Sequence, residues 1–208
     1  MRRSEFIPNH ANELISIANN CIVGYLGMVD PKEYPRVIPL NFILQNNCIY
    51  FHGADEGDKF DVFQTNPKVT FSMVEMYSMI PSYWIAKDYA CPATVFFKSV
   101  YIIGKGNVVN DLEQKAMMLQ GLMEKYQPEG NYKEITTKDS LYKQALEEVI
   151  IFKIAPGKID CKFKFGQNMS VNKRKILIEK LKERNNKVDL KTAEEIKKTF
   201  QPVIDTKK

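Results

Sequence analysis

The strand-like runs of this chain follow one another with few helices between them, and this order constrains the fold more than any other feature. Residues with strand-like alternation and β-branched or aromatic side chains cover 21–30, 36–44, 48–53, 68–76, 96–109 and 148–160. A doubly wound parallel sheet requires strands and helices that alternate throughout the chain. The observed order instead predicts a mainly β, α+β fold, a six-stranded antiparallel barrel with peripheral helices.

Two features place the run 36–44 in the sheet. Asn46 and Asn47 separate it from the run 48–53, and asparagine tolerates the positive φ that a tight hairpin turn needs. Pro39 lies inside the run and cannot donate a hydrogen bond to a β-ladder. We therefore expect a hairpin whose first strand lies at a sheet edge, where a ligand can replace a neighbouring strand.

Apolar residues at helical spacing predict the helices that flank these strands. The expected helical segments are 8–20, 58–64, 111–126, 140–146 and the tail from residue 170. The stretch 77–93 is rich in prolines and aromatic residues and is expected to form a loop or lid. We expect a single domain overall, with a barrel over residues 1–165 and a helical extension over 166–208 that packs on the barrel.

The scarce reactive residues narrow the classes of function. The cysteines at positions 21, 48, 91 and 161 lie too far apart in sequence for a zinc motif or a disulfide framework. The chain has 2 histidines, His10 and His52, which is too few for a His-rich metal site. No GxSxG elbow supports a Ser-His-Asp triad. If the protein is an enzyme, its chemistry is expected to come from a bound cofactor.

Charge and hydropathy give expectations about location and partners. The start of the chain lacks the pattern of a signal sequence, and no apolar run approaches the ~18 residues of a membrane span, so we expect a cytoplasmic protein without a membrane partner. The net charge of +5 comes mainly from the tail after Gly157. A solvated helical surface explains such a tail better than a nucleic-acid face. A nucleic-acid partner is therefore not expected.

The glycine turn in YFHGADEGDKFDVFQTNP, residues 50–67, raises the question of a phosphate site. Gly53 and Gly57 enclose three residues and Asp58 precedes Lys59, so the turn is not a P-loop. Free backbone N–H groups at the helix start, together with Lys59, favour an anion. Alternatively, Asp58 caps an ordinary helix and occupies these donors. The turn alone leaves both interpretations open.

The neighbouring segments resemble a known family. RVIPLNFILQNNCIYFHGADEGDKFDVFQTNPKVTFSM (36–73) and FFKSVYIIGKGNVV (96–109) resemble the flavin-binding split-barrel family typified by pyridoxamine 5'-phosphate oxidase. The branch they resemble most is that of the nitroimidazole-resistance (Nim-type) proteins, with a P-L-N strand, then Y-F-H-G-A and G-x-K. KFGQNMS (164–170), with Arg174 after it, is similar to the same branch. The resemblance implies a six-stranded antiparallel split β-barrel that binds FMN, or less typically FAD.

The resemblance also implies a flavin site across a homodimer interface. Arg36 would lie near the flavin phosphate, the backbone of 38–41 and residues 51–53 would line the ring, and Lys59 with the helix start would hold the phosphate. Two residues of the long strand would approach the flavin from the second subunit. The implied cofactor-binding residues are Arg36, Val37, Ile38, Pro39, Leu40, Asn41, Phe51, His52, Gly53, Gly57, Asp58, Lys59, Lys98 and Ser99.

The function implied by the resemblance is that of a nitroreductase-like oxidoreductase. It would pass electrons from NADH or NADPH to a small oxidised substrate such as a nitroimidazole, with His52 as the candidate catalytic residue. Asn41 stands where the true oxidases have a lysine, and their Arg-rich C-terminal motif is missing, which argues against pyridoxamine phosphate as substrate. Two other functions stay open: a non-catalytic flavin-binding sensor or regulator, and a haem-binding protein that uses His52.

Overall fold

The computed structural model describes residue 6 and residues 12–200, and it divides into two compact units. Unit 2 contains residues 14–73 and 100–160, and unit 1 contains the described residues of 1–13, 74–99 and 161–208. Strands β5 (Lys68–Ile80), β6 (Thr94–Val109) and β7 (Ile150–Lys164) contribute residues to both units. The expected division of the chain at residue 165 stays a prediction.

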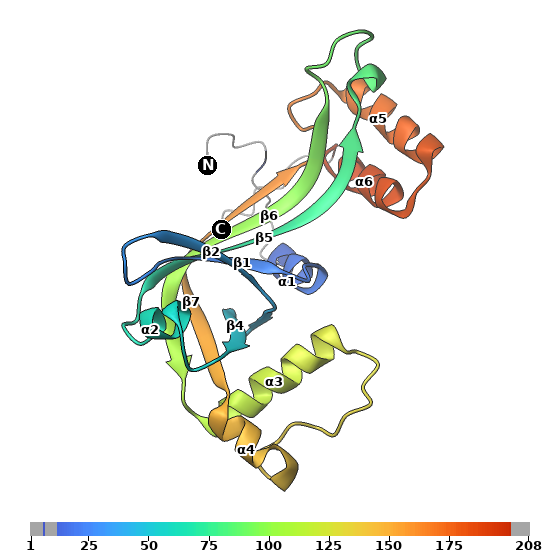
Figure 1. Ribbon diagram of the computed structural model, residues 1–208. Helices are drawn as coiled ribbons and strands as arrows, with labels where there is room; N and C mark the ends of the chain where they lie inside the picture. The colour runs from blue at the N-terminus through green and yellow to red at the C-terminus, as the bar shows by residue number, and fades with distance from the viewer. Residues whose placement is uncertain (1–5, 7–11, 201–208) are drawn as a thin grey trace, which may run out of the picture. The chain divides into compact units, whose positions relative to one another are not determined.

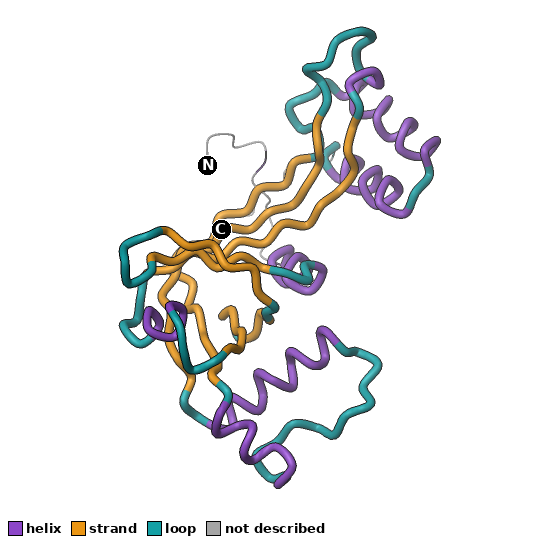
Figure 2. The backbone as a smooth tube through the Cα atoms, in the orientation of Figure 1, coloured by secondary structure: helices purple, strands orange, loops and turns teal. Residues whose placement is uncertain are grey.

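The remaining strands and α-helices have the type that the sequence predicted (Figures 1 and 2). The other strands are β1 (Gly24–Val29), β2 (Pro35–Leu40), β3 (Ile43–Gln45) and β4 (Cys48–Gly53). The helices are α1 (Asn12–Asn20), α2 (Asp58–Phe63), α3 (Leu112–Tyr126), α4 (Ser140–Glu148), α5 (Val171–Arg184) and α6 (Lys187–Lys198), with a 3-10 turn η2 (Ser82–Trp84). Within the described part of the chain, none of the helices has the length and apolar character needed to cross a membrane.

The strands form a sheet in the order β2-β1-β5-β6-β7-β4-β3. The pairs β1–β2, β1–β5, β3–β4 and β4–β7 are antiparallel. Strands β2 and β3 lie at the two edges of this order, although only Asn41 and Phe42 separate them in the sequence. The strands of unit 2 must therefore curl until the two edges approach each other, which gives an antiparallel half-barrel whose closure is not shown.

The prediction of six strands was wrong, because the described residues form seven. The run predicted as one strand over 36–44 breaks at Asn41–Phe42 into β2 and β3. The backbone of Phe42 bonds to α3 instead of to a neighbouring strand: its N–H donates to Tyr126 Oη (2.9 Å) and its carbonyl accepts from Lys125 Nζ (2.8 Å). The Phe42 side chain is fully buried against Phe71, with 4.9 Å between the ring centroids. These contacts hold the chain where it leaves one sheet edge for the other.

The predicted hairpin and the predicted edge strand are both confirmed. Asn46 and Asn47 have φ values of 49° and 58°, and Gln45 pairs with Cys48 across the turn. Pro39 pairs with Tyr25 of β1, and β2 has no strand on its other side in the sheet order. Proline suits such an edge strand, because it has no backbone N–H that would be left without a partner on the outer side.

Helix α3 packs on the hairpin of unit 2 and also anchors α4. Met118 and Leu122 of α3 are buried in a cluster with Ile43 and Tyr50 of the hairpin. Asp111 caps α3, as predicted, by accepting a hydrogen bond from the backbone N–H of the third residue of the helix. The buried Lys115 donates from Nζ to carbonyls at the C-terminal end of α4. The lysine therefore satisfies carbonyl groups that the end of a helix leaves without a partner.

In unit 1, α5 and α6 are tied to β5 by a buried polar group. Asp189 of α6 accepts from Arg184 Nε at the end of α5 (2.6 Å) and from the hydroxyl of Ser78 in β5 (2.5 Å). Ser170 caps α5, and Asn185, with φ 53°, ends it. The prediction of a loop from residue 77 was wrong, since β5 continues to Ile80. Buried residues alternate with exposed or half-buried ones from Lys68 to Tyr77, and the buried Ser78 shifts this pattern while the strand continues.

Candidate functional site

The glycine turn connects β4 to α2 in unit 2. Gly57, with φ 84°, is the N-cap residue of α2, and no side chain caps this helix end. Asp58 is therefore the first residue of the helix and not its cap, so the capping explanation of the turn is wrong. A φ of this size favours glycine. The backbone N–H groups of the first turn of α2 are left without a side-chain acceptor from a capping residue.

Lys59 lies against aromatic rings beside this turn. Its Nζ is 4.9 Å from the ring centroid of Phe152 and 5.7 Å from that of Phe51. A Cβ atom on Gly53 would overlap the Lys59 ammonium, so a larger residue here would displace this side chain from its position. Burial lowers the pKa of Lys59 below its ordinary value. No carboxylate of the described residues forms a salt bridge with Lys59, so this cation has aromatic neighbours but lacks a counterion.

His52 lies one residue before Gly53 and is exposed on β4. Desolvation by its neighbours, followed by the charge of the nearby Lys59 ammonium, lowers the pKa of His52 below its ordinary value. The lowered pKa favours the neutral imidazole at neutral pH. A neutral ring can donate one hydrogen bond and accept another.

Arg36 on β2 is held by two carboxylates. Its Nε donates to Asp30 Oδ2 at 2.8 Å, and a second guanidinium nitrogen lies 3.4 Å from a carboxylate oxygen of Asp58. Asp30 is buried and also accepts from the N–H groups of Lys32 and Tyr34 (both 2.9 Å). The hydrogen bond from Arg36 holds the pKa of Asp30 below its ordinary value. The structure thus brings Arg36 to the start of α2.

The other predicted residues of β2 line its edge, whereas Phe51 belongs to the core. Residues 36–41 are exposed or half-buried along the strand and its end. Phe51 is fully buried and stacks on Phe152 with 5.2 Å between ring centroids. Phe51 therefore exposes no surface to a ligand in this structure, and its predicted contact with a flavin stays a prediction, while the sheet order leaves the outer edge of β2 without a neighbouring strand.

Lys98 and Ser99 belong to unit 1, unlike the rest of the predicted site. Lys98 is buried and its Nζ lies 3.0 Å from carboxylate oxygens of both Glu13 and Glu195. Ser99 Oγ lies 3.5 Å from the carbonyl oxygen of Lys162. The Lys98 ammonium is therefore paired with two carboxylates of its own unit. The predicted role of both residues at a flavin stays a prediction.

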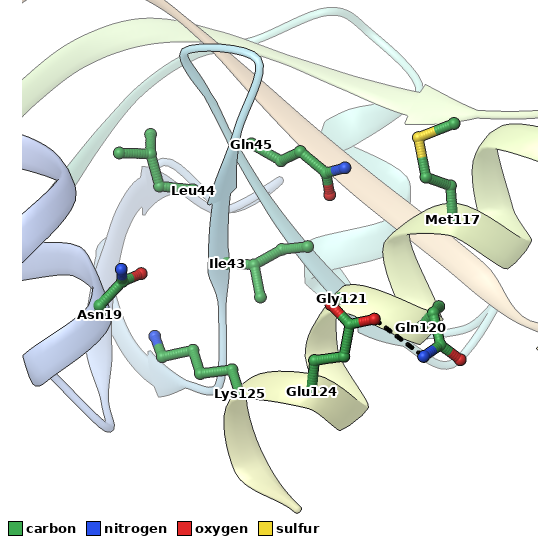
Figure 3. Close-up of a pocket in the computed structure, with 9 residues that line it drawn as sticks. All are labelled: Asn19, Ile43, Leu44, Gln45, Met117, Gln120, Gly121, Glu124 and Lys125. Atoms are coloured by element: carbon green, nitrogen blue, oxygen red, sulfur yellow. Dashed lines mark hydrogen bonds between the residues drawn. The ribbon is translucent and has the colours of Figure 1, made fainter. Parts of the chain in front are cut away.

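A pocket of about 530 Å³ lies elsewhere in unit 2, between the end of α1, the edge strand β3 and α3 (Figure 3). It contains none of the predicted flavin residues. Neither this pocket with its residue Lys125 nor the contact between Asp30 and Arg36 was predicted from the sequence. The Asp30 carboxylate gains this role because Arg36, six residues further along the chain, donates to it from β2.

Comparison with known proteins gives a family match. The family model described as pyridoxamine 5'-phosphate oxidase matches residues 10–162. Among curated proteins, none matches the chain.

Several solved structures share the fold. A candidate 5-nitroimidazole antibiotic resistance protein from Bacteroides thetaiotaomicron has 21% identity and a TM-score of 0.59, covering 75% of this chain and 85% of its own. The flavocytochrome Anf3 from Azotobacter vinelandii has 16% identity and a TM-score of 0.65, covering 79% and 72%. An FAD- and haem-binding protein from Mycobacterium smegmatis has 12% identity and a TM-score of 0.63, covering 76% and 72%. At these identities the similarity establishes the fold alone.

Proposed function

The chain belongs to the pyridoxamine 5'-phosphate oxidase family, and from this premise we propose that it is an FMN-binding flavoprotein that uses NADH or NADPH to reduce small oxidised substrates such as nitroimidazoles. The proposed cofactor-binding residues are those implied by the resemblance, at the edge of β2, the end of β4 and the start of α2. The bound flavin supplies the electron transfer, and the chain supplies binding, orientation and proton contacts.

The observation that carries this proposal is the Lys59 ammonium without a counterion. A cation desolvated against Phe51 and Phe152 gains more from an anionic ligand than an exposed lysine does. A phosphate beside Lys59 would also meet the uncapped N–H groups at the start of α2. The absence of a side chain at Gly53 provides the space in which the ammonium lies. The residues present therefore fit the phosphate of FMN.

Arg36 has a positioning role in this proposal. Its side chain is half exposed, with one face turned to Asp30 and another near Asp58. It offsets the charge of Asp58, which would otherwise repel a phosphate at the start of α2. The edge of β2 offers backbone hydrogen-bonding groups to the polar edge of the flavin ring, because no strand covers that side in the sheet order. His52, next to Gly53, is the candidate proton donor or substrate contact.

An exposed apolar stripe on β1 and β2 supports a homodimer. The strand register places Tyr25 opposite Pro39, Gly27 opposite Val37 and Val29 opposite Pro35, so these residues share one face. The side chains of Tyr25, Val29 and Val37 are 44%, 54% and 71% exposed. Burial of such a stripe by a second copy removes apolar surface from water. In that dimer, Lys98 and Ser99 of the second subunit are proposed to approach the flavin.

The phosphate site is tested by measuring the affinities of wild type and Lys59→Ala for FMN and for riboflavin. FMN and riboflavin differ by the phosphate, and Lys59→Ala removes the proposed partner of that phosphate. We expect the variant to bind FMN roughly tenfold or more weakly, since a charge-assisted contact contributes about 1.5–3 kcal/mol, and to bind riboflavin as the wild type does. Lys68→Ala, at an exposed lysine of β5, is the matched control. Unchanged FMN affinity in Lys59→Ala contradicts the placement of the phosphate.

Anaerobic reduction tests the activity separately. NADH or NADPH should bleach the flavin absorption near 450 nm, and a nitroimidazole should restore it. The first two-electron step consumes one nicotinamide hydride and one proton and converts the nitro group to a nitroso group with release of water. Flavin that binds but is bleached by neither nicotinamide would support the sensor alternative instead.

Haem binding is a second candidate, and the exposed position of His52 on β4 is the observation that favours it. Neutral imidazole is the form that ligates iron. A Soret band in the purified protein that disappears in His52→Ala would establish this alternative.

A further inference from the structure

The pocket between α1, β3 and α3 is lined mainly by polar side chains (Figure 3). Its volume of about 530 Å³ is sufficient for a small metabolite. The lining residues are Asn19, Ile43, Leu44, Gln45, Met117, Gln120, Gly121, Glu124 and Lys125, all in unit 2. The proposed flavin site shares no residue with this set, so a ligand here would be independent of the flavin.

Lys125 provides the positive charge of the pocket. Its Nζ lies 3.7 Å from the ring centroid of Phe42 and donates to the Phe42 carbonyl at 2.8 Å. The salt bridges among residues 12–200 include none to Lys125. Burial lowers its pKa to about 8. A partly buried ammonium with one hydrogen-bond acceptor retains N–H groups for an anionic ligand.

Amide groups and a carboxylate complete the polar lining. Asn19 and Gln45 contribute side-chain amides from α1 and β3. The amide of Gln120 is already used, because its Nε2 donates to Glu124 (2.9 Å) and its oxygen accepts from the Ile135 N–H (3.1 Å). Glu124 accepts this one hydrogen bond and has further acceptor sites on its carboxylate, whereas Lys125 provides donors.

Gly121 keeps the pocket open from the α3 side. A Cβ atom there would lie 2.9 Å from Ile43 Cδ1 and 3.3 Å from Gln45 Oε1. Glycine inside a helix costs about 1 kcal/mol relative to alanine. The close approach of α3 to β3 explains why glycine is present at position 121, and the same residue lines the pocket.

We propose that this pocket binds a small carboxylate, whose oxygens pair with the Lys125 ammonium and accept from the amide of Asn19 on the same side of β3 (Figure 3). One cation matches the single charge of a carboxylate, whereas a phosphate dianion would be opposed by Glu124. The carboxylate can belong to a simple carboxylic acid or to an α-amino acid.

Titration of the purified full-length protein, with any flavin that it carries, tests the proposal. The probes are propionate, L-alanine, propylamine and inorganic phosphate, measured by calorimetry and by amide chemical shifts in NMR. We expect saturable binding of propionate or alanine, with shifts at the backbone amides of Leu44 and Gly121, and no saturable binding of propylamine. Preferred binding of phosphate, or no saturable binding of either carboxylate up to about 50 mM, overturns the proposal.

Two variants give residue-level tests. Lys125→Met should weaken the binding of the carboxylate at least tenfold, while Lys143→Met, at an exposed lysine of α4, should leave it unchanged. Carboxylate affinity that is equal in wild type and Lys125→Met overturns the proposal. The chemical-shift map of the wild type gives the same decision if a variant does not fold.

Discussion

The effect of replacing Lys125 by methionine on the free energy of unfolding should depend on pH. Relative to wild type, the variant should be more stable at pH 7 than at pH 10. Burial lowers the pKa of this lysine from 10.5 to about 8. Between these two values the unfolded chain binds a proton at Lys125 that the folded chain does not, so wild-type stability gains from rising pH. The cost of the buried charge is present at pH 7 and fades as the pH rises through 8 towards 10.5.

The magnitude follows from the two pKa values. Linkage gives about 2 to 3 kcal/mol of stability that wild type gains over the variant between pH 7 and pH 10. The hydrogen bond from Nζ to the Phe42 carbonyl is lost in the variant at both pH values, so it shifts both measurements together. The pH-dependent difference is therefore the quantity to compare.

Urea denaturation of wild type and Lys125→Met at pH 7 and pH 10 measures this difference. We expect the free energy of unfolding of the variant, relative to wild type, to fall by about 2 to 3 kcal/mol from pH 7 to pH 10. Lys143→Met, at an exposed lysine, should show a relative stability that changes little with pH. A difference for Lys125→Met that is independent of pH would refute the argument that burial perturbs this lysine.

Three further predictions concern other buried contacts. Lys115→Met should lower the free energy of unfolding by about 2 kcal/mol in urea denaturation, because carbonyls at the end of α4 lose their donor. Asp189→Asn should lower the free energy of unfolding by about 3 kcal/mol at pH 7, because Arg184 loses its charged partner. The hydrogen bond from Arg184 is the main cause that lowers the pKa of Asp189. The difference between wild type and variant should therefore shrink as acid protonates the carboxylate below pH 3.8. Gly53→Ala should weaken FMN several-fold in a fluorescence titration by displacing the Lys59 ammonium, whereas Gly157→Ala, where the nearest atom is 3.6 Å away, should not.

Features encoded by neighbouring residues could be predicted from the sequence. Asn46 and Asn47 specify the hairpin by tolerating positive φ, and Asp111 specifies the start of α3 by capping it. These signals depend on a few adjacent residues, so they do not require the tertiary structure.

Features that depend on distant residues could not be predicted. The break between β2 and β3 depends on Tyr126 and Lys125, which lie more than 80 residues after Phe42. The salt bridges of Lys98 to Glu13 and Glu195 join three separate segments of unit 1. A sequence pattern indicates that a lysine lies on a strand, but it does not identify the carboxylates that the fold brings to it.

The candidate site shows the same division. Gly53, Gly57 and Lys59 lie within seven residues, so their common location at one turn followed from the sequence. The desolvation of Lys59 by Phe152 came only with the structure, because that ring is contributed by β7. The pocket of Lys125 is formed by α1, β3 and α3, which are far apart in the sequence, so a local motif could not predict it.

The absorption spectrum of the purified protein, with quantification of released flavin, tests the central claim most directly. A flavoprotein should show two bands near 370 and 450 nm, and heat or acid should release FMN at about one molecule per chain, or the apoprotein should take up FMN to that stoichiometry. A colourless protein that FMN does not saturate would contradict the account.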